Sequence, residues 1–432
     1  MARIASTGGN QRNGETTRSL AAAFRRFFVG RPGGRRFDAS LGGTIRPLKL
    51  LERVPLNVLL RFDGVSANRF ARLRFSVERS LIVGFRPLNG PLTTPGSASI
   101  IGKIKRRERW TRFEKTARNG EKRKTMRTVD LFAGCGGLSL GFARQGFNVV
   151  GAFEFWPTAA ACYRANFDHP VSETDLSDVD AAVAEIRAFE PEAIIGGPPC
   201  QDFSQAGKRV EAERANLTEC FARVVSEIRP RCFAMENVER ARHSKAFATA
   251  RKLFKNAGYG LTEVVLDASR CGAPQKRKRF VCLGIQGVVD GFATEIIESR
   301  LSKTPTTVRD YFGDSLPFEY YYRHPRNYNR RAVFSVDEPA PTMRGVNRPV
   351  PKGYPGHSND ACSLAERPEI RALTTAERAQ IQTFPADFRW VGTKTDAEQM
   401  IGNAVPVKLA EFVAETLRLA LEKTENAGKT AE

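Results

Sequence analysis

The sequence predicts an α/β protein built on a doubly wound, parallel sheet, joined to a smaller irregular region. Between residues 126 and 285, short apolar segments typical of strands alternate with segments of helical spacing. A glycine-rich turn follows the first of these strands. From about residue 286 to 370 the alternation gives way to a stretch rich in proline, arginine and aromatic residues, and helical spacing then returns. Together these observations favour a Rossmann-like sheet with a small inserted domain.

The elements follow in order along the chain. Apolar runs predict strands at 128–132, 148–153, 193–195, 231–235, 260–268 and 279–285. Helical spacing is found at 138–145, 158–166, 179–189, 245–257, 375–382 and 405–421. Gly146 is a typical stop for the first of these helices. Ligands of such sheets bind at the carboxyl ends of the strands, so we looked for functional residues there.

The positive charge of the chain lies almost wholly in its first 125 residues. The 432 residues carry a formal net charge of +21. Residues 1–125 hold 28 of the 68 Lys and Arg residues but 8 of the 47 Asp and Glu residues, so the remainder is nearly neutral. Such an excess indicates an acidic partner, with nucleic acid as the default expectation.

Three interpretations of residues 1–125 stay open on the sequence alone. The segment is a basic arm that binds DNA phosphates, an Arg-rich targeting peptide, or a stretch outside the natural protein, which would then start at Met126. Met126 is followed at once by Arg127 and the strand TVDLF, as a true start often is.

The cysteine and hydropathy patterns exclude several classes of protein. No run of about 18 apolar residues predicts a membrane span, and no compact apolar segment at the N-terminus predicts a secretory signal. The eight cysteines form no CxxC pair, and no Cys/His cluster has metal-ligand spacing. We therefore expect free thiols, a cytoplasmic protein close to the nucleoid, and no metal cofactor.

The turn DLFAGCGG places Gly134, Gly136 and Gly137 where the first strand ends. Glycine allows sharp turns and a close approach of backbone to ligand, but neither GxGxxG nor a GK[ST] ending is present. Glu154 ends the second strand, where an acid hydrogen-bonds ribose hydroxyls in other nucleotide-binding sheets, and Asp175 follows the third. These residues together indicate a nucleoside-bearing cofactor, whereas each alone fits a tight turn or a solvated loop acid equally well.

Cys200 stands out in the segment GGPPCQDFS, directly after the apolar run AII. Pro198 and Pro199 stiffen the backbone that leads to it. Thiolate is the attacking form of cysteine, and a position near a helix N-terminus lowers a thiol pKa. A lone cysteine is more often an inert core residue, but this flanking sequence favours a nucleophile.

Two further motifs follow the fourth strand and open the sixth. Glu236 of ENV is placed for general-acid work if burial raises its pKa; the alternative is a capping or ion-paired acid. In QKRKR the strand alternation puts Gln275, Arg277 and Arg279 on one face. That face anchors either an anionic substrate or Glu236; the alternative is a solvated basic edge strand.

The ordered set of motifs resembles the DNA (cytosine-5) methyltransferases, the Dcm-like modification enzymes. It comprises DLFAGCGG, Glu154, Asp175, GGPPCQDFS, ENV, QKRKR, RALTTAERAQIQTFP and GNAVP, and it covers about residues 127–422. Eight motifs in the same order are far more specific than any one of them.

The resemblance implies S-adenosyl-L-methionine as the cofactor. The positions it assigns to that pocket are Phe132, Gly134, Gly136, Leu138, Glu154, Asp175, Pro198, Asn403 and Val405. One departure is Trp156, because the family often has an acid two residues after the ribose glutamate. We expect Trp156 either to stack on adenine or to belong to the core.

The resemblance also implies a covalent mechanism on a cytosine flipped out of duplex DNA. Cys200 attacks ring C6, Glu236 donates a proton or hydrogen bond at N3, and Arg277 holds the base and orients Glu236. Residues 286–394 form the DNA-reading insert, and residues 126–285 with 395–432 form the catalytic domain. The residues expected at DNA are Gln201, Ser204, Lys208, Arg209, Gln275, Arg279, Arg326, Arg330, Arg344 and Arg348. We expect a monomer acting on one short target sequence, alongside a cognate restriction endonuclease.

Two rival functions stay open at this point. The first is a related methyltransferase acting on tRNA, because that branch shares PPCQ and ENV. The second is a catalytically silent DNA-binding protein with the same fold, although the intact set of Cys200, Glu236 and Arg277 argues against it.

Overall fold

The computed structural model describes residues 2–5, 59–62, 125–199, 216–327 and 329–431. The chain divides into two compact units, Met1–Glu108 and Arg109–Glu432. In the first unit, β1 (Ala2–Ala5) pairs in antiparallel fashion with β2 (Leu59–Phe62). The three interpretations of the basic segment are not decided by this pairing and stay predictions.

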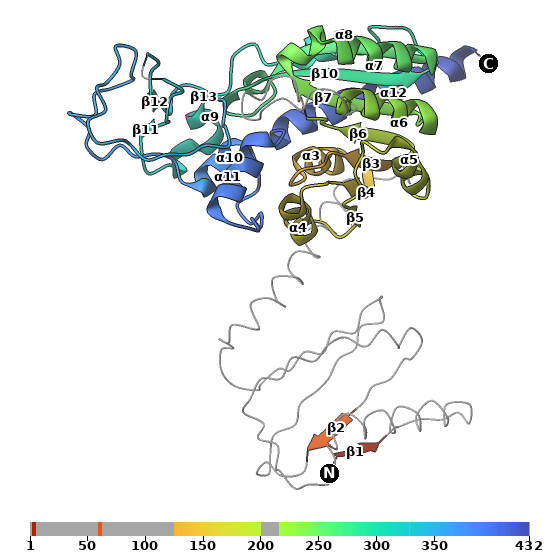
Figure 1. The fold of residues 1–432 in the computed structure, drawn as a ribbon, viewed down its shortest axis with the longest axis horizontal. Helices are drawn as coiled ribbons and strands as arrows, with labels where there is room; N and C mark the ends of the chain where they lie inside the picture. The colour runs from red at the N-terminus through yellow and green to blue at the C-terminus, as the bar shows by residue number, and fades with distance from the viewer. Residues whose placement is uncertain (1, 6–58, 63–124, 200–215, 328, 432) are drawn as a thin grey trace. The chain divides into compact units, whose positions relative to one another are not determined.

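The second unit is organised around a mixed sheet of seven strands in the order β5-β4-β3-β6-β7-β10-β8 (Figure 1). Neighbours from β5 through to β7 pair in parallel, as expected. The strands are β3 (Arg127–Leu131), β4 (Asn148–Phe153), β5 (Val171–Ser172), β6 (Ala193–Gly196), β7 (Cys232–Val238), β8 (Tyr259–Asp267) and β10 (Lys278–Gln286).

The expectation of an entirely parallel sheet is wrong for β10, which runs antiparallel to both of its neighbours, β7 and β8. The segment between Asp267 and Lys278 explains the reversal. It holds a short 3-10 turn and β9 (Gln275–Lys276), and it lacks the helix that a parallel crossover requires. The reversal sets the QKRKR motif at the same sheet edge as the carboxyl end of β7.

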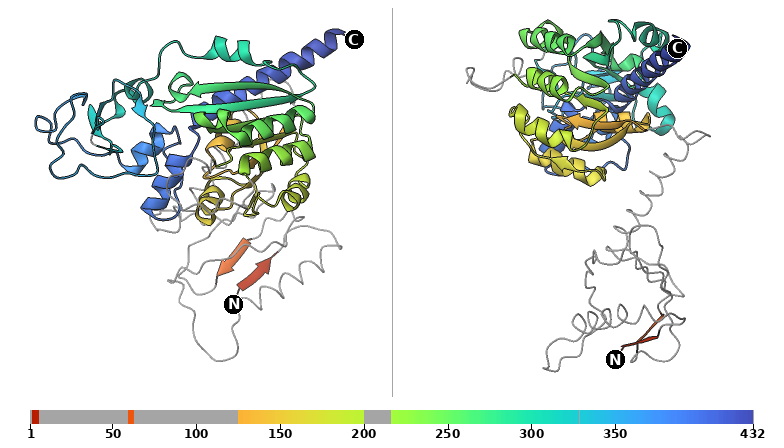
Figure 2. Two further views of the ribbon diagram at one scale, coloured as in Figure 1. Left: turned by 45° about the horizontal axis from the view of Figure 1, so that its top comes forward. Right: turned by 90° about the vertical axis from the view of Figure 1, so that its right-hand side faces the viewer.

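Helices cover both faces of the sheet, as a doubly wound fold requires (Figures 1 and 2). Ile194 packs with one helical layer and Ile195 with the other, following the strand alternation. The first layer contains α5 (Val179–Arg187), α6 (Leu217–Ile228) and α7 (Lys245–Asn256). The second contains α3 (Gly137–Arg144), α8 (Thr294–Arg300) and α12 (Val407–Ala431).

Helix α12 returns from the end of the chain to pack on α3, the helix that follows the glycine turn. A Cβ on Gly141 would lie 2.3 Å from the Cβ of Ala410, so this contact needs glycine. The predicted C-terminal helix at 405–421 is confirmed, with a start two residues later. Helix α6 was not predicted; it begins after Asn216, whose side chain accepts a hydrogen bond from the N–H of Thr218.

The inserted region has a small core of its own. Tyr321 and Tyr322 are almost fully buried, and Tyr321 packs with Val308, Phe334 and Met343. These two tyrosines therefore belong to a core. Between residues 308 and 403 the structure has α9 (Val308–Phe312), β11 (Tyr320–Tyr322), β12 (Val333–Ser335), β13 (Ala340–Pro341), α10 (Thr375–Ile381) and α11 (Lys394–Asn403). Helix α4 (Pro157–Asn166) belongs to the sheet domain. The domain limits at 286 and 394 stay predictions. Among the described helices, none has the length and apolarity to cross a membrane.

Candidate active site

The turn between β3 and α3 has a backbone that demands glycine. Phe132, Gly134 and Gly136 have φ angles of 57°, 56° and 98°, all in the left-handed region. A Cβ on Gly137 would lie 2.4 Å from the carbonyl oxygen of Val405. The GNAVP segment therefore lies against the glycine turn, as the resemblance implied.

Glu154, at the end of β4, closes the other side of this turn. Its Oε2 accepts a hydrogen bond of 2.7 Å from the N–H of Gly134, and its Oε1 accepts one of 2.8 Å from the N–H of Trp156. Burial raises the pKa of the Glu154 carboxyl above its usual range. The predicted acid and the predicted turn thus lie together at adjacent strand ends.

The aromatic side chain exposed beside Glu154 is Phe155, which the sequence analysis missed. Its side chain is 63% exposed, one of the few large apolar side chains at the surface of the described residues. Trp156 is half-buried and packs against a core cluster that includes Phe384 and Met400. The signal available in the sequence was an aromatic residue directly after the acid.

A chain of buried polar groups lies beneath the glycine turn. Asp130 of β3 accepts hydrogen bonds from the N–H and the Oγ of Ser139, at 3.1 and 2.6 Å. Ser139 Oγ is 2.6 Å from the hydroxyl of Tyr163, which is 2.6 Å from Nε2 of His169. Burial raises the pKa of Asp130 to about 7. This chain ties the start of α3 to β3 and was also not predicted.

The other positions expected at the cofactor are spread around the same edge. Asp175 is exposed in the loop after β5, where its Oδ1 accepts from the N–H of Ser177. Asn403 is exposed at the end of α11. The side chain of Leu138 packs into the core, which leaves its backbone as the part that faces the turn.

The carboxyl ends of β6 and β7 are joined by one buried amide. Asn237, 3% exposed, donates a hydrogen bond of 3.0 Å from Nδ2 to the carbonyl of Pro198. This bond ties Pro198 to the strand that carries Glu236. Cys200 itself lies outside the described residues, as do Gln201, Ser204, Lys208 and Arg209.

Glu236 lies beside Gly197, just after β6, and its carboxylate is paired with an arginine. Its Oε1 lies 2.8 Å from Nε of Arg279, and the two side chains are 13% and 14% exposed. A Cβ on Gly197 would be 3.3 Å from Oε2 of Glu236. Burial raises the pKa of Glu236, and the positive charge of Arg279, more than that of Arg277, opposes the rise.

The ion pair with Glu236 is made by Arg279, whereas Arg277 bonds elsewhere. Arg277 is 1% exposed and donates to three backbone carbonyls, those of Met343 at 3.0 Å, Gly402 at 2.9 Å and Ala404 at 3.0 Å. Through these bonds from Nη1 and Nη2 the guanidinium joins the insert to the GNAVP segment. Arg277 therefore interacts with Glu236 electrostatically, and no hydrogen bond joins the two side chains in the described structure.

The prediction that Gln275 contacts DNA is wrong for this conformation. Its side chain is fully buried, where Nε2 donates to Gln382 Oε1 at 2.7 Å and Oε1 accepts from the N–H of Met343 at 2.8 Å. The strand alternation of QKRKR is nevertheless confirmed, because Lys276 and Lys278 are exposed while Gln275 and Arg277 are buried.

The predicted arginines of the insert remain accessible in most cases. Arg326, Arg330 and Arg348 are exposed, and Arg344 is half-buried with Nη2 donating to the carbonyl of His324. Within the described residues, none of the four forms an ion pair. No group of three His, Cys, Asp or Glu side chains with metal-binding geometry occurs in that part of the chain either.

Removing the amide of Asn237 is expected to separate the two halves of this site. Asn237→Ala leaves the Pro198 carbonyl without its partner and releases Pro198 from β7. For the methyl transfer and the cofactor that the resemblance implies, we expect the rate to fall about 10²-fold while the affinity for S-adenosylmethionine changes less than about twofold, since the glycine turn is untouched. Single-turnover kinetics and calorimetric titration measure the two quantities. Equal losses in both would contradict this role.

Comparisons with known proteins place the chain in a family. The family model for C-5 cytosine-specific DNA methylase matches residues 126–418. The chain is 55% identical over 301 residues, 69% of this chain and 96% of the relative, to type II methyltransferase M.HgiDI of Herpetosiphon aurantiacus. It is 54% identical over 293 residues, 68% of this chain and 96% of the relative, to type II methyltransferase M.HindV of Haemophilus influenzae.

Solved structures support the fold. The Dnmt2 methyltransferase of S. pombe aligns with a TM-score of 0.52 at 19% identity, covering 69% of this chain and 99% of that one. A putative DNA modification methyltransferase from an E. coli prophage aligns with a TM-score of 0.51 at 23% identity, covering 69% of this chain and all of that one. On the family match and the two high-identity relatives, the chain belongs to the C-5 cytosine-specific DNA methylases and is a DNA cytosine-5-methyltransferase.

Proposed function

We propose that the protein transfers a methyl group from S-adenosylmethionine to C5 of a cytosine flipped out of a short, specific duplex sequence, through a covalent bond between Cys200 and ring C6. The observation that supports this proposal is the hydrogen bond that joins the chain at the carboxyl ends of β6 and β7. There the Asn237–Pro198 hydrogen bond joins Pro198, two residues before Cys200, to the strand that presents Glu236, and Gly197 lies beside the Glu236 carboxyl. The relatives M.HgiDI and M.HindV are both named type II methyltransferases, which supports a modification enzyme that protects DNA from a cognate restriction endonuclease.

The residues at the exits of β3 and β4 fit S-adenosylmethionine. The glycine turn offers a backbone that no side chain obstructs at Gly134, where a Cβ would have no neighbour within 4 Å. Glu154 offers carboxylate oxygens for ribose hydroxyls, and the exposed ring of Phe155 offers a flat apolar surface for adenine. The bound cofactor would supply an electrophilic methyl group. The protein's own residues would fix its position and exclude water.

Phe155→Ala tests the assignment of the adenine surface. Loss of this stacking area is expected to weaken S-adenosylmethionine binding about tenfold and leave kcat at saturating cofactor nearly unchanged. Trp156→Phe serves as the control, because Trp156 packs against a core cluster. Calorimetric titration measures both variants. An unchanged affinity for Phe155→Ala would place adenine elsewhere.

The chemistry assigns one step to each polar side chain. The thiolate of Cys200 forms a bond to ring C6, which pushes electron density toward C5 and N3. Protonated Glu236 donates at N3, so that negative charge does not build up on the ring. C5 then takes the methyl group, loses its proton to a base and expels the thiolate. Arg279 holds the Glu236 carboxyl in place throughout.

The target cytosine must leave the base stack to reach such a site, at a cost of a few kcal/mol. The segment 201–209 is proposed to close over the DNA, with Ser204, Lys208 and Arg209 toward phosphates. The exposed arginines of the insert, Arg326, Arg330 and Arg348, are proposed to contact DNA bases or phosphates.

Bisulfite sequencing tests the proposed function directly. The full chain is expressed in a bacterial host that lacks cytosine methylation, and both genomic DNA and tRNA are sequenced against an empty-vector control. Protected cytosines at one short DNA motif, with unmodified tRNA, are the expected result. Methylation confined to tRNA would replace the proposal with the RNA alternative, and no methylation from soluble protein would contradict both.

A further inference from the structure

Three arginines hold the backbone of one short loop of the insert. Arg323 donates from Nη2 to the carbonyl of Thr342 at 2.6 Å, Arg277 donates from Nη1 to that of Met343 at 3.0 Å, and Arg378 donates from Nη2 to that of Arg344. Three successive carbonyls are thus each held by a side chain from a different element. We call residues 342–348 the clamped loop.

The rest of the clamped loop is fixed as firmly. Asn347 donates from Nδ2 to the carbonyl of Leu373 at 2.8 Å and to Oε1 of Glu398 at 3.0 Å. At Gly345 a Cβ would lie 2.1 Å from Oε1 of Gln399, so the backbone packs directly on α11. Every residue from 342 to 345, and Asn347, is therefore tied to the body of the protein.

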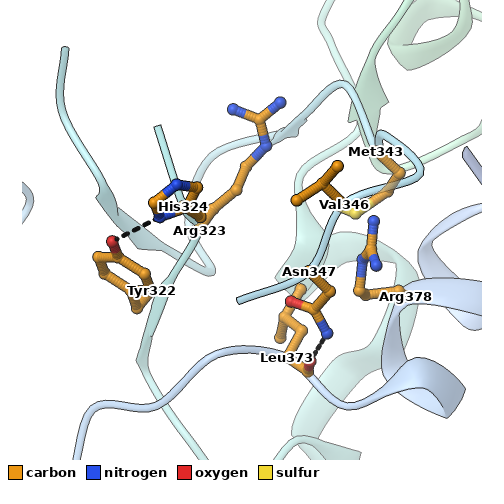
Figure 3. A pocket seen from close by; sticks show the side chains of 8 residues that line it. All are labelled: Tyr322, Arg323, His324, Met343, Val346, Asn347, Leu373 and Arg378. Atoms are coloured by element: carbon orange, nitrogen blue, oxygen red, sulfur yellow. Dashed lines mark hydrogen bonds between the residues drawn. The ribbon is translucent and has the colours of Figure 1, made fainter. Parts of the chain in front are cut away.

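Between these ties the loop presents Val346 to solvent. Its side chain is 51% exposed, one of three large exposed apolar side chains among the described residues. Arg348, two residues on, is exposed as well. Figure 3 shows the small pocket beside Val346, with Arg323 and His324 on one side and Met343 and Arg378 on the other.

The surroundings of the loop carry an excess of positive charge. Burial, reinforced by the nearby charge of Arg344, lowers the pKa of Arg323 to about 10 and that of Arg378 to about 10. Glu398 pairs with Arg378 and is buried. Burying cations beside one another costs free energy, and the arrangement therefore favours an anionic partner at this surface together with a loop of fixed shape.

We propose that the clamped loop is a rigid base-reading element, that Val346 is a specificity-determining residue contacting the methyl group of a thymine in the major groove, and that Arg323 and Arg378 are positioning residues for it. This inference rests on the proposed action on duplex DNA. The C5 methyl of thymine is the apolar group that unmodified base pairs offer in the major groove, which suits an exposed valine set among arginines. A rigid loop loses little conformational entropy on binding, so the free energy of its contacts is available to distinguish one base pair from another.

The test is methylation of a duplex library with randomised sequence, followed by bisulfite sequencing, for the wild type, Val346→Ala and Val289→Ala. Val289 is a matched control, 79% exposed in the loop between β10 and α8. Val346→Ala is expected to reduce discrimination at one A·T position about fourfold, the value of one buried methyl group, with other positions unchanged. Val289→Ala should reproduce the wild-type preferences.

Replacing that thymine with uracil removes only the methyl group and isolates the contact. Wild-type kcat/KM should fall about fourfold on the uracil duplex, and Val346→Ala should show no further fall. A uniform change at all positions, or preferences equal to those of Val289→Ala, would overturn the proposal. If the wild type methylates no cytosine in the library, the proposed function itself has failed.

Arg378→Lys tests the positioning role. Lysine keeps a positive charge opposite Glu398, but one ammonium cannot reproduce the planar fork that also reaches the Arg344 carbonyl. The variant is expected to lose discrimination at the same base pair as Val346→Ala, with melting temperature and S-adenosylmethionine affinity retained. The double variant should be no worse there than Val346→Ala alone. Additive losses, or losses spread over all positions, would contradict the role.

Discussion

Cys200→Ala is expected to abolish DNA methylation, with a fall of at least about 10⁴-fold in the single-turnover rate. The reason is chemical: C5 of cytosine is a weak nucleophile until a thiolate adds at C6, and alanine offers no such electron pair. Transfer of labelled methyl groups to duplex DNA measures the rate. S-adenosylmethionine affinity should stay within about twofold, because Cys200 is not among the residues assigned to that pocket.

Cys362→Ala provides the matched control for this variant. Cys362 is a free, half-buried thiol in the insert, far along the chain from the PPC segment. Its replacement should leave the methylation rate unchanged. If Cys200→Ala retained more than about one hundredth of the wild-type rate, covalent attack by this thiol would be excluded.

Glu236→Gln is expected to lower kcat about 10³-fold, within the range for loss of a positioned general acid. Glutamine keeps the shape and can donate a weak hydrogen bond, but it cannot transfer a proton to N3. Glu263→Gln is the control, since Glu263 lies exposed on β8 and pairs with Arg251 at 2.6 Å. A comparable loss in both variants would mean that carboxylates act here through overall charge.

The pH dependence of kcat follows from the sign of the Glu236 shift. Burial raises the pKa of Glu236 above its usual range, so the protonated form persists to higher pH. Activity that needs this proton is present below the raised pKa and is lost as pH rises through it. Arg279→Met removes the cation that opposes the rise, so the alkaline limb should move to higher pH. If the alkaline limb does not move in Arg279→Met, or if it persists in Glu236→Gln, the loss of activity at high pH must be assigned to another titratable group.

The features that the sequence predicted well are those set by local backbone geometry. The glycine turn and Glu154 lie together because strand ends that neighbour one another in a parallel sheet share an edge. The alternation of QKRKR followed from the strand period alone. The same period could not say which of two arginines on one face meets Glu236. That choice depends on β10 running antiparallel to β7, which sets Val281 opposite Glu236 and leaves Arg279 within reach.

The failures came from contacts between segments distant in sequence. Gln275 is buried because Gln382 and Met343, which lie 107 and 68 residues further on, satisfy its amide. Arg277 is bound by carbonyls of the insert and of the GNAVP segment, and no periodicity predicts such partners. The sequence does not distinguish the environments of Phe155 and Trp156, because residue type alone does not tell an exposed ring from a partly buried one.

The most direct test of the covalent mechanism is a duplex carrying 5-fluorocytosine at the methylated position that bisulfite sequencing identifies. Fluorine at C5 cannot leave as a proton, so the bond between Cys200 and C6 should persist after methyl transfer. The expected result is a DNA adduct that survives denaturation, forms only with S-adenosylmethionine present and maps by mass spectrometry to the peptide containing Cys200. An enzyme that methylates the ordinary duplex but yields no adduct, or an adduct at another residue, would contradict the account.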